Sequence, residues 1–339
     1  MSEVASPSAP KRPRLDRLAA LTEAAARGER WLRERLTQPP RPLAAVEVRA
    51  RAVGVMRVTR EGSRLALGAA ASLDLPPGAL RLSMTESNLA DPAAFTHTLR
   101  AALERAGALE AGRVGLVLPD PVARVALVPQ AELPDKGRTP NEEMIRFKLR
   151  KSVPFEIREA KLAFAAPGGR SEEPIVVAAI FKPVLEAYEA ACRAVGVQPG
   201  IVELAGLALL STAFGALPAA DRLLVNWDEG YVTLLLARGP WPIVVRTLVG
   251  PAAAEPADVA REVEQTVLYY RERLGGPGLE KVVVRSAAIP SAQALRVLEP
   301  ALGFVPEVLE PLEAMRATGV DGASQALAGA AACLAGSRP

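Results

Sequence analysis

Apolar and polar residues alternate from Ala44 to Leu80, and this pattern predicts an antiparallel meander of β-strands. Turn signals at Glu61-Gly62 and Pro76–Gly78 divide the stretch. Apolar residues then recur at helical spacing over 91–107, where Asp91 is the expected N-cap. The pattern therefore predicts that the body of the chain opens with strands and continues with a helix.

The middle of the chain mixes short strands with helices. Two strands are predicted around Pro119-Asp120-Pro121, and a helix is predicted over 139–155. Thr139 and Glu142 fit a capping box, which places the start of that helix at Thr139. Two further strands, in "AKLAFAA" and "PIVVAAIF", precede a helix that ends at Val195.

An acidic turn interrupts the next pair of β-rich runs. The apolar run Ile201–Leu217 carries Glu203 and is short for a bilayer span, so we interpret it as a buried strand followed by a helix. The β-rich runs Leu223–Asn226 and Tyr231–Ala237 then flank Trp227-Asp228-Glu229-Gly230. This pattern predicts a β-hairpin whose turn carries two carboxylates.

The last third continues the alternation of strand and helix. A strand in "WPIVVRTLVGP" precedes an amphipathic helix over 257–276, and a buried strand, a turn and a helix are predicted over 280–303. A helix of small residues, suited to close packing on a sheet, is predicted over 321–336. Local hairpins occur together with crossovers, which predicts an α/β fold with antiparallel portions.

Composition narrows the class of protein. The 339 residues are 50% apolar and 23% charged, which is typical of a globular chain with two domains or one large domain carrying an insertion. We find no transmembrane helix and no secretory signal in the sequence, so the chain is expected to stay in the cytosol. Cys192 and Cys333 lie far apart without a CxxC pair, which favours a reducing compartment and no structural zinc. With His97 as the single histidine, the sequence argues against a Ser/His/Asp hydrolase and against a histidine metal site.

The basic charge of the chain is concentrated at its N-terminus. Residues 1–42 hold nine Lys and Arg against five Asp and Glu, and the remaining charges nearly balance. The body has no basic stripe with interleaved aromatic residues, so nucleic-acid binding is not expected. Apolar residues at helical spacing over 14–36 indicate a helix that packs on the body or a solvated linker. The alternative is a helix that makes peripheral contact with anionic lipid or docks a partner.

Several segments together carry a family resemblance. They are "LPDPVARVALVP", "NEEMIRFKLRKSVPFEIREAKLAF", "VNWDEGYVTLLLARGPWPIVVRTLVG", "VAREVEQTVLYYRERLGGPGLEKVVV" and the Gly-containing C-terminal helix. In this order they resemble the actin-like ATPase superfamily, and within it the PilM family of type IV pilus assembly proteins, which is related to FtsA and to the cytoplasmic part of GspL. The resemblance covers residues 44–336 and implies an actin-like (ribonuclease H-like) α/β fold of two lobes. It places the lobes at 43–219 and 220–339, with an inserted α+β subdomain at about 114–197.

The sequence departs from the family at three nucleotide-binding places. The resemblance implies two D-x-G hairpins that hold the phosphates and a Gly-Gly turn that admits the adenosine. An Asp suits Mg²⁺ or its waters, and a Gly lets backbone N–H groups approach an anion. Here Glu47-Val48-Arg49 stands at the first hairpin, Asn226-Trp227-Asp228 stands at the second, and Ser286-Ala287 stands at the third place, with no glycine from 279 through 302.

These departures indicate a pseudo-ATPase without catalytic residues, metal or cofactor. A carboxylate at Asp228 would repel a triphosphate by about a few kcal/mol per charge pair at an effective dielectric of ~20, enough to remove micromolar binding. We therefore expect the acidic turn to replace a phosphate. Asp228 or Glu229 would pair with Arg49 or Arg51 across the two lobes, unless these charges simply face solvent.

A second way of aligning the hairpin with the D-x-G pattern, which we call the second register, retains a nucleotide site. Asp228-Glu229-Gly230 is itself a D-x-G sequence, although it leaves the second strand of the hairpin short before Gly239. In that register the protein would be a divergent actin-like ATPase with a weak ATP/Mg²⁺ site.

The resemblance also implies a role and partners. PilM-like proteins are non-catalytic cytoplasmic adaptors, peripheral at the inner membrane, in type IV pilus or related type II secretion assembly. They bind the N-terminal peptide of a PilN-like membrane protein, form a homo-oligomeric ring and reach the motor ATPases indirectly. The peptide groove would lie near 139–155, with Met144, Phe147 and Leu149 as candidate contacts.

Overall fold

The computed structural model describes residues 41–62, 64–130, 141–167, 173–214, 220–239, 241–310 and 325–335. The basic tail and its segment 14–36 lie outside the described residues, so the predictions about them stay predictions. From Pro42 onward the chain belongs to one unit, which contains both lobes.

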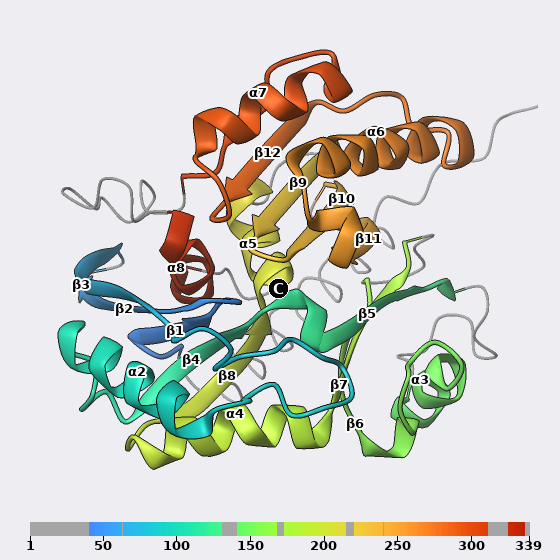
Figure 1. Cartoon of the computed structure of the whole chain (residues 1–339). Helices are drawn as coiled ribbons and strands as arrows, with labels where there is room; N and C mark the ends of the chain where they lie inside the picture. The colour runs from blue at the N-terminus through green and yellow to red at the C-terminus, as the bar shows by residue number, and fades with distance from the viewer. Residues whose placement is uncertain are drawn as a thin grey trace, which may run out of the picture. The chain divides into compact units, whose positions relative to one another are not determined.

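A mixed sheet forms the centre of the first lobe (Figure 1). Its first three strands form the expected antiparallel meander, and two later strands join in parallel. A turn over 49–51, where the Arg49 amide donates to the Ala52 carbonyl at 2.9 Å, adds to the two turns predicted from the sequence. In sheet order the strands are β3 (Arg64–Asp74), β2 (Ala52–Glu61), β1 (Ala44–Val48), β4 (Arg113–Leu118) and β8 (Gln198–Leu204).

The second lobe is built on a sheet of the same kind. Its first hairpin is tighter than predicted, because Asp228 pairs with Tyr231 and leaves only Glu229-Gly230 in the turn. Gly230 has φ +76°, the left-handed conformation that such two-residue turns favour. In sheet order the strands are β11 (Trp241–Val249), β10 (Tyr231–Arg238), β9 (Asp221–Asp228), β12 (Lys281–Ser286) and β13 (Glu307–Val308).

The two sheets follow one plan. In each, the first strand of the meander lies at the centre, between the rest of the meander on one side and two parallel strands on the other. This duplication confirms the predicted α/β fold of two lobes.

Amphipathic helices cover the outer face of each sheet (Figure 1). In the second lobe, buried Val259, Val263, Val267 and Tyr270 form the apolar stripe that the sequence predicts. Tyr269, the neighbour of Tyr270, is 48% exposed, as expected for a residue at the rim. The covering helices are α2 (Pro92–Arg105) and α4 (Lys182–Ala194) on the first lobe, and α6 (Pro256–Arg273) and α7 (Ser291–Leu302) on the second.

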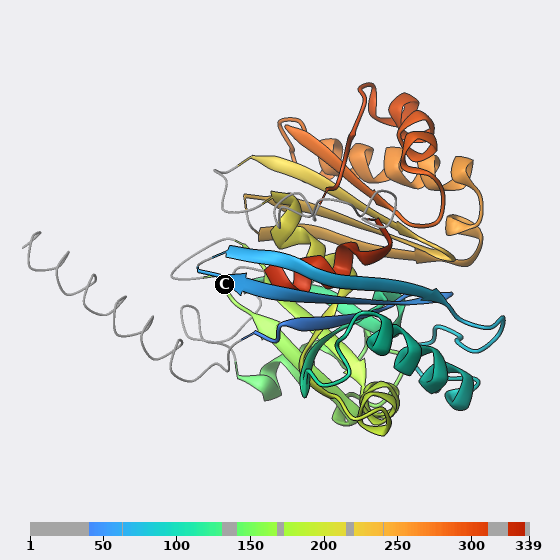
Figure 2. The same cartoon turned by 90° about the vertical axis from the view of Figure 1, so that its left-hand side faces the viewer.

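Two apolar helices, α5 (Ala205–Phe214) and α8 (Ala328–Ala335), lie between the sheets of the two lobes (Figure 2). α8 packs on the first sheet through Ala330, Ala331 and Leu334, and it contacts the α5 cluster through Ala328 and Ala332. Its small residues allow this close approach, as the sequence predicts. Short 3-10 helices span Asp120–Val122, Ile157–Glu159, Gly250–Ala253 and Gln325–Leu327.

The inserted module is a three-stranded antiparallel sheet covered by one helix. β4 belongs to the first sheet, and α4 packs in the core of the first lobe, so the module is narrower than the expected range of 114–197. The helix begins after Asn141, whose side chain accepts the Met144 amide at 2.8 Å, so it starts later than predicted; Thr139, the predicted cap, lies outside the described residues. The module consists of β5 (Ala123–Val128), β7 (Ile175–Phe181), β6 (Ala160–Ala165) and α3 (Glu142–Leu149).

Candidate functional site

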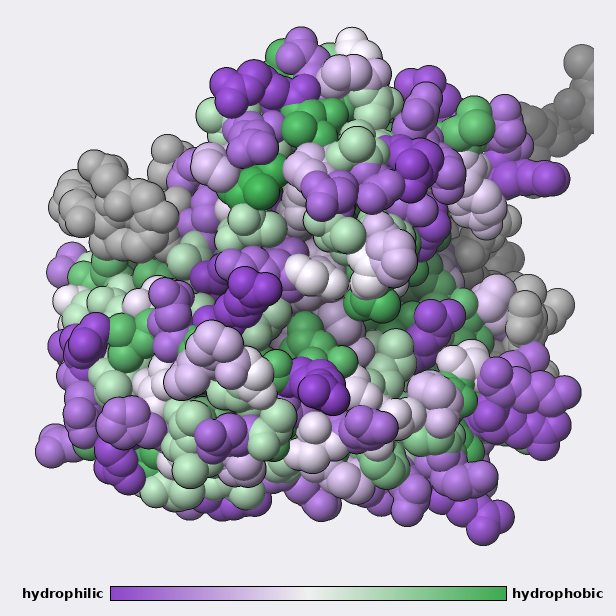
Figure 3. Space-filling model, in the orientation of Figure 1, coloured by the Kyte–Doolittle hydropathy of each residue, from purple (hydrophilic) through white to green (hydrophobic). Residues whose placement is uncertain are grey.

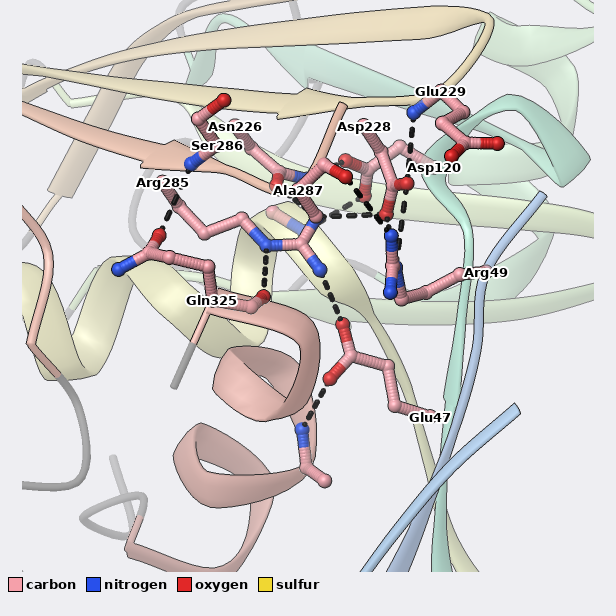
Figure 4. Close-up of polar contacts among 12 residues, drawn as sticks. Glu47, Arg49, Asp120, Asn226, Asp228, Glu229, Arg285, Ser286, Ala287 and Gln325 are labelled. Carbon is pink, nitrogen blue, oxygen red and sulfur yellow. Dashed lines mark hydrogen bonds and ion pairs between the residues drawn. The ribbon is translucent and has the colours of Figure 1, made fainter. Parts of the chain in front are cut away.

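Arg49 and Asp228 meet at the boundary between the two lobes (Figure 4). Arg49 follows β1 and Asp228 ends β9, so each stands where the central strand of its lobe ends. The Arg49 Nε lies 3.4 Å from Oδ1 and 3.3 Å from Oδ2 of Asp228. Arg49 is 8% exposed and Asp228 is 1% exposed. The predicted pairing is therefore present, as a buried ion pair that joins the lobes.

The two residues occupy corresponding positions in the two sheets. β1 runs parallel to β4, and β9 runs parallel to β12. Glu47 pairs with the penultimate residue of β4, and Asn226 pairs with the penultimate residue of β12. Glu47–Arg49 and Asn226–Asp228 are therefore equivalent segments, which agrees with the first of the two registers considered above.

Arg285, on β12, is the centre of the network (Figure 4). Its side chain is 0% exposed. Nη1 donates to Asp228 Oδ2 at 2.7 Å and to Asn226 Oδ1 at 3.1 Å. Nη2 donates to Glu47 Oε1 at 2.9 Å, and Nε donates to the Gln325 carbonyl at 2.9 Å. One guanidinium thus binds a carboxylate from each lobe.

Glu47 extends the network to α8. Its Oε2 accepts the Ala330 amide at 2.9 Å, in the first turn of that helix, where a carboxylate is favourable. A Cβ on Gly329 would lie 2.7 Å from the Glu47 Cδ, so any larger residue there would displace the carboxylate. Glu47 therefore holds β1, β12 and α8 together.

Asp120, which follows β4, adds a third carboxyl group to the network, through Asn226. Its Oδ1 accepts the Gly206 amide at 2.8 Å, and its Oδ2 accepts from Asn226 Nδ2 at 2.9 Å. The residue is 2% exposed. Because Gly206 lies in the first turn of α5 and Asn226 lies on β9, Asp120 links the first lobe to both elements.

The three carboxylates differ in protonation behaviour. Burial raises the pKa of Glu47 in spite of the nearby Arg285, and burial also raises the pKa of Asp120. Burial acts in the same direction on Asp228, but the Arg285 and Arg49 guanidiniums outweigh it and lower the pKa of that carboxyl. Asp228, which lies between two guanidiniums, is therefore the one of the three whose pKa is lowered.

Most of the remaining predicted residues lie in or beside this network. The Ser286 amide donates to Gln325 Oε1 at 3.0 Å, and the Ala287 carbonyl accepts from Arg49 Nη2 at 3.1 Å. The second predicted pair, Arg51 Nε to Glu229 Oε2, measures 3.2 Å, with Arg51 81% exposed. Gly230 lies apart, on the exposed turn.

Sequence reasoning missed three members of the network, namely Asp120, Arg285 and Gln325. A signal existed for the first two. Asp120 is a carboxylate enclosed by two prolines after an apolar strand, and Arg285 follows three valines in a strand predicted to be buried. A charge in such a place needs a partner. Gln325 carries no comparable signal, since only its position in the fold brings it to Ser286.

The three candidate peptide contacts on α3 do not share one surface. Leu149 is 3% exposed and belongs to the core of the inserted module, so it is not available as a peptide contact. Met144 packs partly against the same core. Phe147 points outward and is 61% exposed.

Two absences hold for the described residues. No cluster of three or more His, Cys, Asp or Glu side chains is arranged there to hold a metal ion. None of the helices in these parts of the chain is both long and apolar enough to cross a bilayer.

Comparison with known proteins supplies a fold relationship. No family model and no curated protein matches the sequence. The structure is similar to a chain of a solved "PilM-PilN type IV pilus biogenesis complex", with a TM-score of 0.69 and 22% identity, over 87% of this chain and 97% of that chain. It is also similar to a Bacteroides thetaiotaomicron protein of actin-like ATPase fold and unknown function, with a TM-score of 0.51 and 7% identity, over 81% of this chain and 95% of that chain. The chain therefore has the actin-like ATPase fold.

Proposed function

We propose that this protein is a non-catalytic, actin-like adaptor in a type IV pilus assembly system or the related type II secretion system, at the cytoplasmic face of the inner membrane. The observation that carries the proposal is the buried network of Glu47, Arg49, Asp120, Asp228 and Arg285, which fills the lobe boundary with the protein's own charges. The chain would act through its surfaces, with no reaction at this boundary.

The residues at the boundary do not fit a magnesium nucleotide. Side chains stand at both places where the family pattern has a glycine, because Arg49 and Asp228 occupy them. The carboxylates of Glu47 and Asp228, each 1% exposed, are already bound to the guanidinium of Arg285. Each of their four oxygens thus accepts at least one hydrogen bond from the protein itself.

The energy of the ion pairs supports the same conclusion. An anion that took the place of Asp228 beside Arg49 and Arg285 would leave this buried carboxylate without its cations, and an uncompensated buried charge costs about 3–5 kcal/mol. That cost alone corresponds to a loss of roughly a hundredfold to several thousandfold in affinity. Ordinary micromolar nucleotide binding would not survive it.

The partner in this proposal is a PilN-like inner-membrane protein. The support is the similarity to a chain of a PilM-PilN complex, whose title names the two proteins together. We propose that its N-terminal peptide binds on the inserted module and the strands beside it. We extend the proposal to a homo-oligomeric ring that links this membrane protein to the motor ATPases.

One observation favours the alternative, a divergent ATPase. Asp228-Glu229-Gly230 occupies a tight turn, with Gly230 at φ +76° and the Glu229 amide donating to Asp228 Oδ1 at 2.8 Å. This is the local geometry of a D-x-G hairpin. The Asp228 side chain is nevertheless bound by two guanidiniums, and for that reason we prefer the non-catalytic function.

A paired experiment tests the proposal. The full chain is titrated with a synthetic N-terminal peptide of the PilN-like protein from the same organism, with a scrambled peptide as control, and phosphate release from ATP with Mg²⁺ is followed with and without the peptide. We expect saturable binding of the native peptide only, and no phosphate release above buffer. Equal binding of both peptides would contradict the partner, and peptide-stimulated phosphate release would support the ATPase instead.

A further inference from the structure

Phe147 protrudes from the outer face of the inserted module. It is 61% exposed, the largest exposed fraction among the exposed large apolar residues of the described chain. Its helix, α3, is fixed from below, since Ile145 and Leu149 are 0% and 3% exposed in the core of the module. The ring is therefore held outward by a rigid support.

Cations surround this ring. The Arg150 guanidinium lies over the Phe147 ring at 4.3 Å from its centroid, and Lys148, Arg150 and Lys151 are exposed. No acidic residue occurs from 144 through 155. We call Phe147, Lys148, Arg150 and Lys151 the α3 basic face. Hydrophilic residues gather at the lower right of Figure 3, where Figure 1 places α3.

The neighbouring elements add charge of both signs. Exposed Arg158 and Lys161 lie on the segment that leaves α3, with Lys182 close by, since its Nζ lies 3.4 Å from the Arg158 carbonyl. Exposed Glu142 and Glu143 in the first turn of α3, and exposed Glu156 and Glu159 beyond it, partly offset them. The excess of positive charge is thus strongest on the α3 basic face itself.

We propose that the α3 basic face docks this protein on the anionic surface of a lipid bilayer. Clustered Lys and Arg are attracted to anionic headgroups, and an aromatic ring at the centre of the cluster can enter the headgroup region while the long cationic side chains reach the phosphates. The Arg150 guanidinium can remain stacked on the ring while it binds a phosphate. This attachment goes beyond the adaptor function and does not depend on the nucleotide question.

The shape of the face favours a bilayer over an acidic peptide. Peptides usually bind in a groove or along a free sheet edge, where their backbone and side chains find partners on several sides. Here the apolar neighbour Met144 packs inward on the module, and Phe147 stands on the convex side of a helix. A protruding ring among cations suits a broad, deformable, negatively charged surface.

Vesicle co-sedimentation of the full chain tests the proposal. Vesicles of phosphatidylcholine with phosphatidylglycerol are compared with vesicles of phosphatidylcholine alone. The variant F147S/R150E/K151E should lose on the order of tenfold or more in partition onto the anionic vesicles, since each cation near such a surface contributes about 1 kcal/mol. Added salt should weaken wild-type binding, because the charges are exposed.

A matched variant on another surface serves as control. L268S/R271E/R273E changes one exposed apolar residue and two exposed cations on α6, and it should bind anionic vesicles as wild type does, within about twofold. Thermal melts of both variants should match that of wild type, because the substituted side chains are exposed. Equal loss in the two variants, unchanged binding of the α3 variant, or no preference of wild type for anionic vesicles would each overturn the proposal.

Discussion

Arg49 and Asp228 are 179 residues apart in the sequence, yet their side chains form a buried ion pair with an Nε to Oδ2 distance of 3.3 Å. One belongs to each lobe, and they stand at equivalent ends of two equivalent hairpins. The duplication of the fold brings them opposite one another. The positive charge at the end of one hairpin is thus neutralised by the negative charge at the end of the other.

The first prediction concerns Arg285, which binds both Glu47 and Asp228. Arg285→Met removes the shared cation and leaves two buried carboxylates facing each other, so we expect the free energy of unfolding to fall by about 3–5 kcal/mol. Urea denaturation followed by circular dichroism measures this change.

The exposed pair supplies the control for this experiment. Arg51→Met breaks the contact with Glu229, but Arg51 is 81% exposed, so the expected change is within about 0.5 kcal/mol. Similar losses in the two variants would mean that the Arg285 network contributes no more than a surface ion pair.

The second prediction concerns the close contact of Gly329 with Glu47. In Gly329→Ala the new Cβ would lie 2.7 Å from Cδ and 2.8 Å from Oε1 of Glu47, so the carboxylate must move away from the Ala330 amide. We expect a loss of about 1–3 kcal/mol in the free energy of unfolding.

A double-mutant cycle isolates that contact. In the Glu47→Ala background the clashing atoms are absent, so adding Gly329→Ala should lower stability only slightly. If both backgrounds lose the same amount, the effect of Gly329→Ala comes from the helix itself and not from Glu47.

The third prediction concerns the dependence of stability on pH. Because the pKa of Asp120 is raised in the folded protein, the folded state binds a proton that the unfolded state releases above the ordinary value of 3.8. The contribution of Asp120 to stability is thus largest below that pH and falls as the pH rises toward the folded pKa. The stability of wild type relative to Asp120→Asn should decline over this window.

Asp228→Asn should reveal the opposite dependence of stability on pH. Although burial acts against it, Arg285 and Arg49 lower the pKa of Asp228, so its contribution is present above the ordinary value of 3.8 and is lost as the pH falls below it. Unfolding free energies of wild type and both variants, measured from acid to neutral pH, report the two slopes. Slopes of the same sign would contradict the assignment of charges in the network.

The elements of the fold were largely predictable because their signals are local. The valines and Tyr270 of α6 repeat at helical spacing, and the hairpin around Glu229-Gly230 has β-rich runs on both sides of a glycine. The exact ends of the helices and strands were harder to predict from the sequence. The predicted start of α3 was too early because Asn141 caps the helix, and the sequence offers Thr139 and Asn141 alike as side chains suited to that role.

The residues of the site could be predicted only where the two equivalent hairpins could be compared with each other. Comparison of the two hairpins led to Arg49 and Asp228 and to their pairing. The central role of Arg285 could not be read from its neighbours, since its partners come from β1, β9 and the C-terminal segment. Leu149 was assigned to a surface because helical spacing alone does not reveal which face of α3 the sheet covers.

The most direct measurement of the central claim is an isothermal titration of the full chain with ATP and Mg²⁺, with Asp228→Gly measured beside it. If the charge network stands in place of a nucleotide, wild type gives no saturable heat up to millimolar ATP, and Asp228→Gly binds no more weakly than wild type. Saturable micromolar binding by wild type that Asp228→Gly abolishes would contradict the account, because Asp228 would then serve the nucleotide and not Arg49.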